Sequence, residues 1–296
     1  MRVIEPRHRH RPAPAAKPPR KRSWSVTRKA AVVAGVTFVT LASLAWWIDL
    51  KPDRSLVDVI TRREAASQVA AEPEKRIQTF SATAFYDLYS TFAYPNTQEI
   101  QVPPAITSNP EADKRIREIA EKRGYKLRSV PVAPINKTNE KNLEGDDLLQ
   151  PLALAGWQDL KARAAADGQP LRLLSGYRSI EYQRQLFIDR LLAAGAYTAD
   201  IANGLADAKV ENVLSNAAPP GYSRHHTGYT IDLACYPNGA FVAFKDSPCF
   251  SWIKANNYQI AKETGWIPSY PEGADQQGPE PEPWEYVWVG QDAVKD

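Results

Sequence analysis

Apolar residues recur along the chain at two spacings, one typical of short helices and the other of short strands. Helical spacing between turn residues predicts helices at 111–122, 148–166, 180–194 and 251–264. Short apolar or alternating runs predict strands at 125–135, 171–174, 229–234, 241–244 and 284–289. Helices mixed with a few short strands predict an α+β domain, which we place at residues 120–296.

Two segments ahead of this domain differ from it in composition. Residues 49–79 are rich in Ala, Glu, Arg and Gln and predict a helix, whereas residues 93–110 are rich in proline and predict a linker. We therefore interpret residues 49–119 as a helical stalk followed by a linker.

The longest uncharged run of the chain covers residues 30–48. As a helix it would span about 28 Å, close to the thickness of a bilayer core. Two tryptophans close the run, and ten Lys/Arg precede it within residues 1–29. These features predict a single-pass membrane anchor with a cytoplasmic tail at 1–29 and an extracytoplasmic domain. The alternatives are a cleaved signal peptide, whose apolar core is usually shorter, and a buried helix, which needs a polar face.

Charge is segregated along the chain. Residues 1–29 hold ten of the 37 Lys/Arg and one of the 34 Asp/Glu, which leaves 27 basic and 33 acidic residues in the remainder. A basic tail beside an acidic body argues against nucleic acid as the main partner.

The chain has two cysteines, Cys235 and Cys249. On the predicted topology both lie outside the membrane, where an even number of cysteines favours a disulfide. The loop between them is rich in turn residues, and a bridge would hold it in place. Two free buried thiols are the alternative.

Candidate metal ligands gather in two short segments. Residues 223–232 read SRHHTGYTID and contain His225 and Asp232, and residues 282–285 read EPWE and offer Glu282 and Glu285. Two of the four histidines lie in the basic tail, so a three-histidine centre in the domain is excluded. Imidazole and carboxylate both suit zinc, whose catalytic sites keep one position open for water. For each residue taken singly, an ordinary solvated side chain is the alternative.

A third segment adds a fixed positive charge. Residues 175–179 read SGYRS at the junction of a predicted strand and a predicted helix, and Gln183 lies one helical turn further on. Arg178 on such a turn is suited to hold a carboxylate or an oxyanion, because its planar guanidinium donates parallel hydrogen bonds. A structural salt bridge is the alternative interpretation.

The three segments, in this order, resemble the motifs of the VanY-type D-alanyl-D-alanine carboxypeptidases of the M15/LAS metallopeptidase group. The family pattern is Ser-Gly-Tyr-Arg-Ser, then Ser-x-His-x-x-Gly-x-Ala-x-Asp, then Glu-x-Trp-His. The stretch YPEG at 270–273 also resembles the family's loop before the last motif. The resemblance covers about residues 120–293 and implies a single zinc-peptidase-like domain with a small antiparallel sheet and flanking helices.

The resemblance also implies a role for each site residue. Three residues would be the zinc ligands: His225, Asp232 and Glu285. Glu282 would act as the general base, Arg178 would hold the substrate carboxylate or the developing oxyanion, and Gln183 and Ser223 would line the substrate site. The implied reaction is hydrolysis of the D-alanyl-D-alanine end of a peptidoglycan stem peptide by a membrane-anchored enzyme.

Glu285 stands where the family pattern has a histidine. Two carboxylates and one imidazole neutralise a zinc dication, whereas two imidazoles and one carboxylate leave one positive charge. A neutral centre is a weaker Lewis acid, so we expect Glu285→His to tighten zinc binding and raise turnover. The departure keeps two alternatives open: a catalytically impaired relative that binds cell-wall peptides, and an anchored structural or partner-binding protein.

Overall fold

A computed structural model describes residues 76–141, 146–273 and 277–295. These residues belong to one compact unit, residues 71–296. The predicted tail, the predicted membrane span at 30–48 and nearly all of the predicted stalk helix lie outside the described residues. Within the described ranges, no helix is both long and apolar enough to cross a bilayer.

A four-stranded antiparallel sheet with the strand order β5-β6-β8-β7 forms the centre of the domain. Its strands are β5 (Leu171–Ser175), β6 (Thr230–Cys235), β7 (Trp266–Pro268) and β8 (Glu285–Trp288). The strands predicted at 171–174, 229–234 and 284–289 are thereby confirmed. Two short antiparallel pairs accompany the sheet: β1 (Thr97–Gln98) with β2 (Val130–Pro131), and β3 (Asn136–Lys141) with β4 (Asp146–Leu149).

The strand predicted at 241–244 is wrong. Val242 makes a single bridge to Cys235, the last residue of β6, and a 3-10 turn begins at Phe244. Within the described residues, the apolar run therefore meets only the end of β6 and forms no continuous ladder.

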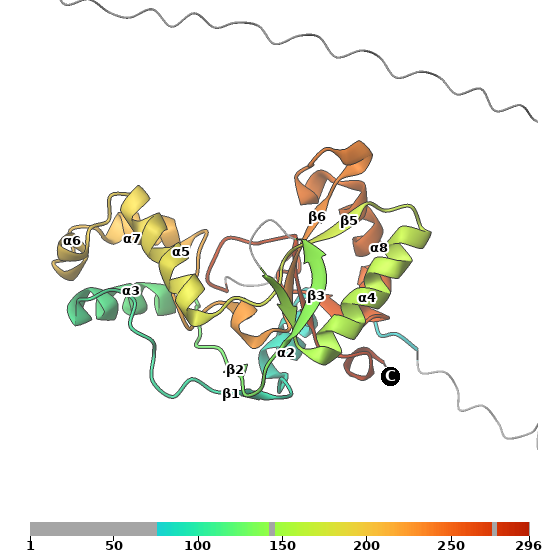
Figure 1. Cartoon of the computed structure of the whole chain (residues 1–296), viewed down its shortest axis with the longest axis horizontal. Helices are drawn as coiled ribbons and strands as arrows, with labels where there is room; N and C mark the ends of the chain where they lie inside the picture. The colour runs from blue at the N-terminus through green and yellow to red at the C-terminus, as the bar shows by residue number, and fades with distance from the viewer. Residues whose placement is uncertain (1–75, 142–145, 274–276, 296) are drawn as a thin grey trace, which may run out of the picture. The chain divides into compact units, whose positions relative to one another are not determined.

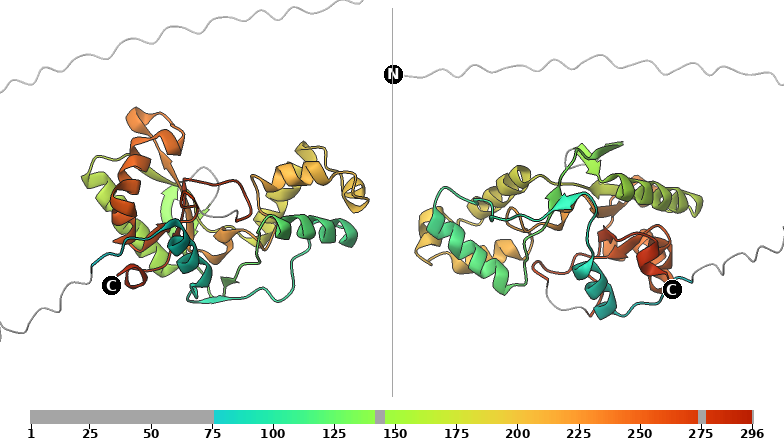
Figure 2. Two further views of the ribbon diagram at one scale, coloured as in Figure 1. Left: turned by 180° about the vertical axis from the view of Figure 1, so that it is seen from behind. Right: turned by 90° about the horizontal axis from the view of Figure 1, so that it is seen from below.

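The helices form two groups, one at the left of Figure 1 and one packed with the central sheet. One group has its own hydrophobic core and consists of α3 (Pro110–Lys122), α5 (Ile180–Ala193), α6 (Thr198–Ala202) and α7 (Asp207–Leu214). The other shares a core with the sheet and consists of α2 (Ala82–Thr91), α4 (Pro151–Ala166) and α8 (Pro248–Lys262). The same separation is visible from behind in the left view of Figure 2.

Side-chain caps fix where several helices begin. Ser179 accepts a hydrogen bond from the Tyr182 amide at 3.1 Å and starts α5, directly after the SGYRS segment. Ser247 starts α8 in the same way, with Pro248 in the first turn. α8 is interrupted at 255–258, where residues 256–258 have left-handed backbone angles, so the continuous helix predicted at 251–264 is only partly correct.

Residues 76–119 pack against the domain, which differs from the expectation of a stalk and linker. Ile77 forms a β-bridge with Lys295, and Phe85 and Tyr89 of α2 are buried in the core of the sheet. Ile106, within the proline-rich stretch, is buried in the other core, and its amide donates to the Asp113 carboxylate at 2.8 Å. The proline-rich stretch is therefore an ordered part of the domain.

The cysteines form the predicted disulfide. Cys235 ends β6 and Cys249 lies in the first turn of α8, with their Cα atoms 6.0 Å apart. The bridge therefore ties the start of α8 to the strand that carries Asp232.

Candidate metal centre and its cleft

The register of the sheet places two carboxylates side by side. Asp232 of β6 pairs directly with Glu285 of β8 on one side and with Ser175 of β5 on the other. Side chains of directly paired residues point to the same face of a sheet. All three side chains are buried, so this row forms an enclosed polar floor.

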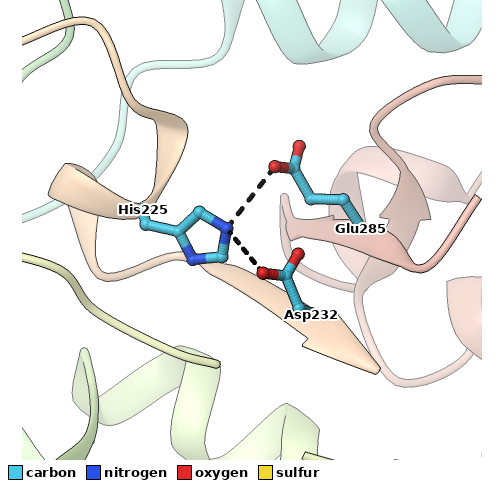
Figure 3. A group of neighbouring side chains, drawn as sticks. All are labelled: His225, Asp232 and Glu285. Atoms are coloured by element: carbon cyan, nitrogen blue, oxygen red, sulfur yellow. Dashed lines mark ion pairs between the residues drawn. The ribbon is translucent and has the colours of Figure 1, made fainter. Parts of the chain in front are cut away.

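His225 reaches the same point from the 3-10 turn η1 (Arg224–Thr227), just ahead of β6. Its Nε2 lies 3.3 Å from Asp232 Oδ2 and 3.5 Å from Glu285 Oε2 (Figure 3). Its Nδ1 lies 2.7 Å from the Gly176 carbonyl oxygen. A carbonyl only accepts, so Nδ1 carries the proton and the other ring nitrogen faces the two carboxylates.

Gly228 ends this turn and lets the chain enter β6. Its φ is +75°, and a Cβ at this position would lie 3.1 Å from Gln150 Cγ. Both the backbone angle and the close neighbour favour glycine here.

The three converging residues fit a zinc ion. One donor atom from each of His225, Asp232 and Glu285 lies within 4.8 Å of the other two. Ligands about 2 Å from a shared tetrahedral ion lie about 3.3 Å apart, so small side-chain movements would complete the shell. Asp232 Oδ1 is buried without a hydrogen-bond partner among the described residues, and a cation would satisfy it.

Each carboxylate is also paired with an arginine. Arg178 donates from Nη2 to Asp232 Oδ2 at 2.6 Å and from Nε to Ser175 Oγ at 2.9 Å. Arg224 donates from Nη1 to Glu285 Oε1 at 2.9 Å, and both members of that pair are buried. Arg178 thus makes the salt bridge that was its alternative interpretation, while still lining the cleft.

Electrostatic contacts shift the pKa values of these groups. Burial and Arg178 disfavour charge on His225, but the attraction of Asp232 and Glu285 prevails and raises its pKa to about 9. Burial likewise opposes charge on Glu285, but Arg224 and His225 lower its pKa to about 2. Glu282 is close enough to feel both acids: burial first, then Glu285 and Asp232, raise its pKa to about 8.

His226 has a structural role. Its Nδ1 donates to the Arg178 carbonyl oxygen at 2.7 Å, and its Nε2 accepts from the Gly221 amide at 3.0 Å. Both nitrogens are thereby used, and burial lowers the pKa of the ring to about 4. His226 therefore joins the segment 223–232 to the SGYRS turn and is not available as a ligand.

A narrow cleft of about 50 Å³ opens onto two of the candidate ligands, His225 and Glu285. The predicted residues Arg178, Gln183, Ser223 and Glu282 all line it. Gln183 donates from Nε2 to the Ala218 carbonyl at 2.8 Å, and its Oε1 is buried without a partner among the described residues. A larger cavity of about 500 Å³ adjoins this cleft, because Tyr270, Gln277, Pro279 and Glu282 line both.

Sequence reasoning missed two arginines of this cleft. Arg224 lies inside the motif SRHH, but its partner Glu285 is 61 residues away and only the fold brings them together. Arg128 lines the cleft from the segment just before β2 and forms no ion pair with any described residue. Arg128 lies in a segment predicted as an edge strand, and nothing in the surrounding sequence indicates that its side chain lines the cleft.

Comparisons with known proteins converge on one family. The model of the VanY family, described as D-alanyl-D-alanine carboxypeptidase, matches residues 146–291. A D-alanyl-D-alanine carboxypeptidase of Enterococcus faecalis (strain ATCC 700802 / V583) is 30% identical over 140 residues, which cover 46% of this chain and 47% of the relative. The chain spans about half the length of the curated relatives it matches.

Solved structures that match part of this chain were also found. VanYB in complex with D-alanine-D-alanine is 23% identical, with a TM-score of 0.42 and coverage of 55% of this chain and 81% of that chain. The LdcB LD-carboxypeptidase is 23% identical, with a TM-score of 0.41 and coverage of 58% and 73%.

Proposed function

Because residues 146–291 form a domain of the VanY family, we propose that this protein is a zinc-dependent peptidase that cleaves the D-alanyl-D-alanine end of peptidoglycan stem peptides. The convergence of His225, Asp232 and Glu285 beside a cleft that Glu282 also lines carries this proposal. The family membership predicted from the three motifs is confirmed, whereas activity and substrate are proposals for this chain.

In this proposal the side chains of the cleft handle the proton and the substrate. Zinc held by the three ligands would supply Lewis-acid chemistry toward a carbonyl and toward water. Glu282 takes a proton from the water that attacks the carbonyl carbon and returns it to the leaving amino group as the peptide bond breaks. In the metal-free chain, burial and the charges of Glu285 and Asp232 raise the pKa of Glu282 to about 8. A zinc ion bound to those two carboxylates would offset their charge and lower this pKa, which favours the ionised form that a base requires.

Two further residues are suited to hold the substrate. Gln183 Oε1, buried and unpartnered among the described residues, would accept a hydrogen bond from a peptide N–H. Arg128 would pair with the terminal carboxylate of the peptide, because its guanidinium lines the cleft without an acidic partner in the described part of the chain. The adjoining cavity has the size for the preceding residues of a stem peptide.

The test combines metal analysis with hydrolysis. We expect the purified chain to bind one zinc ion and to release D-alanine from a peptide ending in D-alanyl-D-alanine. A peptide ending in an L,D bond, assayed in parallel, identifies the preferred linkage. Glu282→Gln should lower turnover about 100-fold or more while zinc and peptide remain bound. Absence of zinc from the wild-type chain would sink the proposal.

A second candidate function is binding of cell-wall peptides without catalysis. The observation that favours it is Glu285 in the position of a histidine, because a site neutralised by two carboxylates activates water less strongly. This candidate predicts that wild type and Glu282→Gln bind the peptide equally and that neither releases D-alanine.

We also propose that residues 30–48 anchor the domain outside the cytoplasmic membrane, where the stem peptide is found. The uncharged run and the basic residues ahead of it support this topology. Protease added to intact cells should then digest the C-terminal domain and spare an epitope placed at residue 1. Digestion of the epitope alone would reverse the topology.

A further inference from the structure

Arg224 and Glu285 form a buried ion pair directly beside the candidate metal centre. Only 5% and 4% of these side chains are exposed. Besides its 2.9 Å hydrogen bond to Glu285 Oε1, Arg224 Nη1 donates to the Ser269 carbonyl at 3.3 Å, and Nη2 donates to Gln277 Oε1 at 2.6 Å. Three acceptors therefore hold the edge of the guanidinium.

Two aromatic rings hold the faces of the same guanidinium. Its central carbon lies 3.9 Å from the centroid of the Tyr270 ring and 4.7 Å from that of the Tyr89 ring. Such contacts between an arginine and aromatic rings are attractive, and more so when they are shielded from water. Tyr89 comes from α2 and Tyr270 follows β7, so distant parts of the chain fix Arg224 in one position.

Arg224 determines which carboxylate oxygen of Glu285 faces the candidate metal site. Arg224 engages Oε1, so the carboxylate directs Oε2 toward His225 Nε2, 3.5 Å away (Figure 3). Glu285 thus offers a single oxygen to an ion shared with His225 and Asp232.

The same arginine changes the charge of the centre. A dication with two carboxylates and one imidazole is neutral, and the guanidinium paired with Glu285 adds one positive charge beside that of Arg178. We infer that Arg224 and Glu285 act as one unit that replaces the last histidine of the family pattern, with Arg224 as a positioning residue for the third ligand. This inference rests on the proposed metal site.

The unit reverses the effect that the sequence predicts for Glu285→His. That substitution would leave the Arg224 guanidinium buried, without its carboxylate and next to a dication. A buried charge that loses its partner is strongly unfavourable. Zinc binding should therefore weaken, unless Arg224 is replaced as well.

The test compares four full chains, each purified free of metal: wild type, Arg224→Gln, Glu285→His and the double variant. Competition with a chromophoric chelator gives the zinc dissociation constant, and urea unfolding without metal gives the stability. We expect Glu285→His to weaken zinc binding at least about tenfold when Arg224 is present, and to strengthen it when Gln occupies position 224.

Arg163→Gln is the matched control. It removes one positive charge from ion pairs with Asp159 and Glu263, away from the candidate ligands. We expect it to leave the zinc dissociation constant within about twofold of the wild-type value, since exposed pairs contribute little.

The outcomes separate the two proposals. Equal effects of Glu285→His in both backgrounds overturn the inference and leave the metal site standing. A wild-type chain that binds no zinc overturns the proposed function and the inference with it. If Glu285→His alone does not fold, a folded double variant supports the pair, and an unfolded double variant contradicts it.

Discussion

At the scale of single residues, the site consists of buried charges of opposite sign, and each of them would be unfavourable if it were buried alone. Asp232 and Glu285 lie on neighbouring strands, and Arg178 and Arg224 each neutralise one of them. Truncating either arginine removes the shorter ion pair of a buried carboxylate and leaves it only its contact with His225. Arg178 is therefore expected to influence metal binding through Asp232 as well as substrate binding in the cleft.

His225 gives the metal-free protein a pH dependence. Its pKa is raised from 6.5 to about 9, so the folded state holds a proton that the unfolded state has lost between these values. This contribution to stability is fully present below pH 6.5 and is lost as the pH rises through 9. The loss is on the order of 3 kcal/mol at about 1.4 kcal/mol per pKa unit.

Urea unfolding of the metal-free chain between pH 6 and 10 measures this effect. Glu282, with its pKa raised to about 8, contributes in the same direction but over a lower range. The comparison is therefore made with His225→Gln, whose stability should fall less steeply above pH 6.5. Parallel curves for the two proteins would contradict the assignment of this proton to His225.

At the scale of elements, the turn that carries His225 depends on Gly228. Gly228→Ala would introduce both left-handed backbone strain and a contact of 3.1 Å with Gln150 Cγ. We expect a loss of about 2 kcal/mol of stability, made up of roughly 1 kcal/mol from the backbone and a similar amount from packing. Zinc affinity should fall too, because η1 would move.

Gly168→Ala separates these two contributions. Gly168 follows α4 with a φ of +68° and has no described atom within 4 Å of an added Cβ. The Gly168→Ala variant should lose only the backbone contribution to stability and should keep its zinc affinity. Equal destabilisation of the two variants, with zinc binding unchanged in both, would show that the Gln150 contact is unimportant.

The four longest described helices, α3, α4, α5 and α8, could be predicted from the sequence because their signals are local, whereas α2 and α7 were not predicted. α3, α5 and β6 follow from caps and apolar spacing within a few residues. α6 and β7 have five and three residues, too few to establish a period. The ligand set came from motifs, whereas the Arg224–Glu285 pair joins a 3-10 turn to a strand 61 residues away, and no single segment encodes that contact.

At the scale of the whole molecule, the folded unit extends well ahead of the segment that matches the family. Phe85 and Tyr89 of α2 are buried in the core of the sheet, and Tyr89 covers one face of Arg224. Ile116 of α3 is fully buried in the second core. Residues 76–119 therefore supply part of both cores and part of the wall around the site.

This arrangement predicts the outcome of truncation. A chain that starts at residue 76 should unfold at nearly the temperature of the full chain, whereas one that starts at residue 120 should aggregate or unfold without a cooperative transition. Burying one large apolar side chain contributes about 1.5–3 kcal/mol, and the shorter chain loses several. Calorimetry of both measures the difference, and a cooperative transition for residues 120–296 would refute the prediction.

The direct pairing of Asp232 with Glu285 has a consequence for assembly. A slip of one residue between β6 and β8 would turn one of the two acids toward the opposite face of the sheet. Only strands β6 and β8 paired in this register can then bind an ion together with His225. Metal present during refolding would therefore favour the chains in which β6 and β8 have paired in the native register, because only these chains bind the ion.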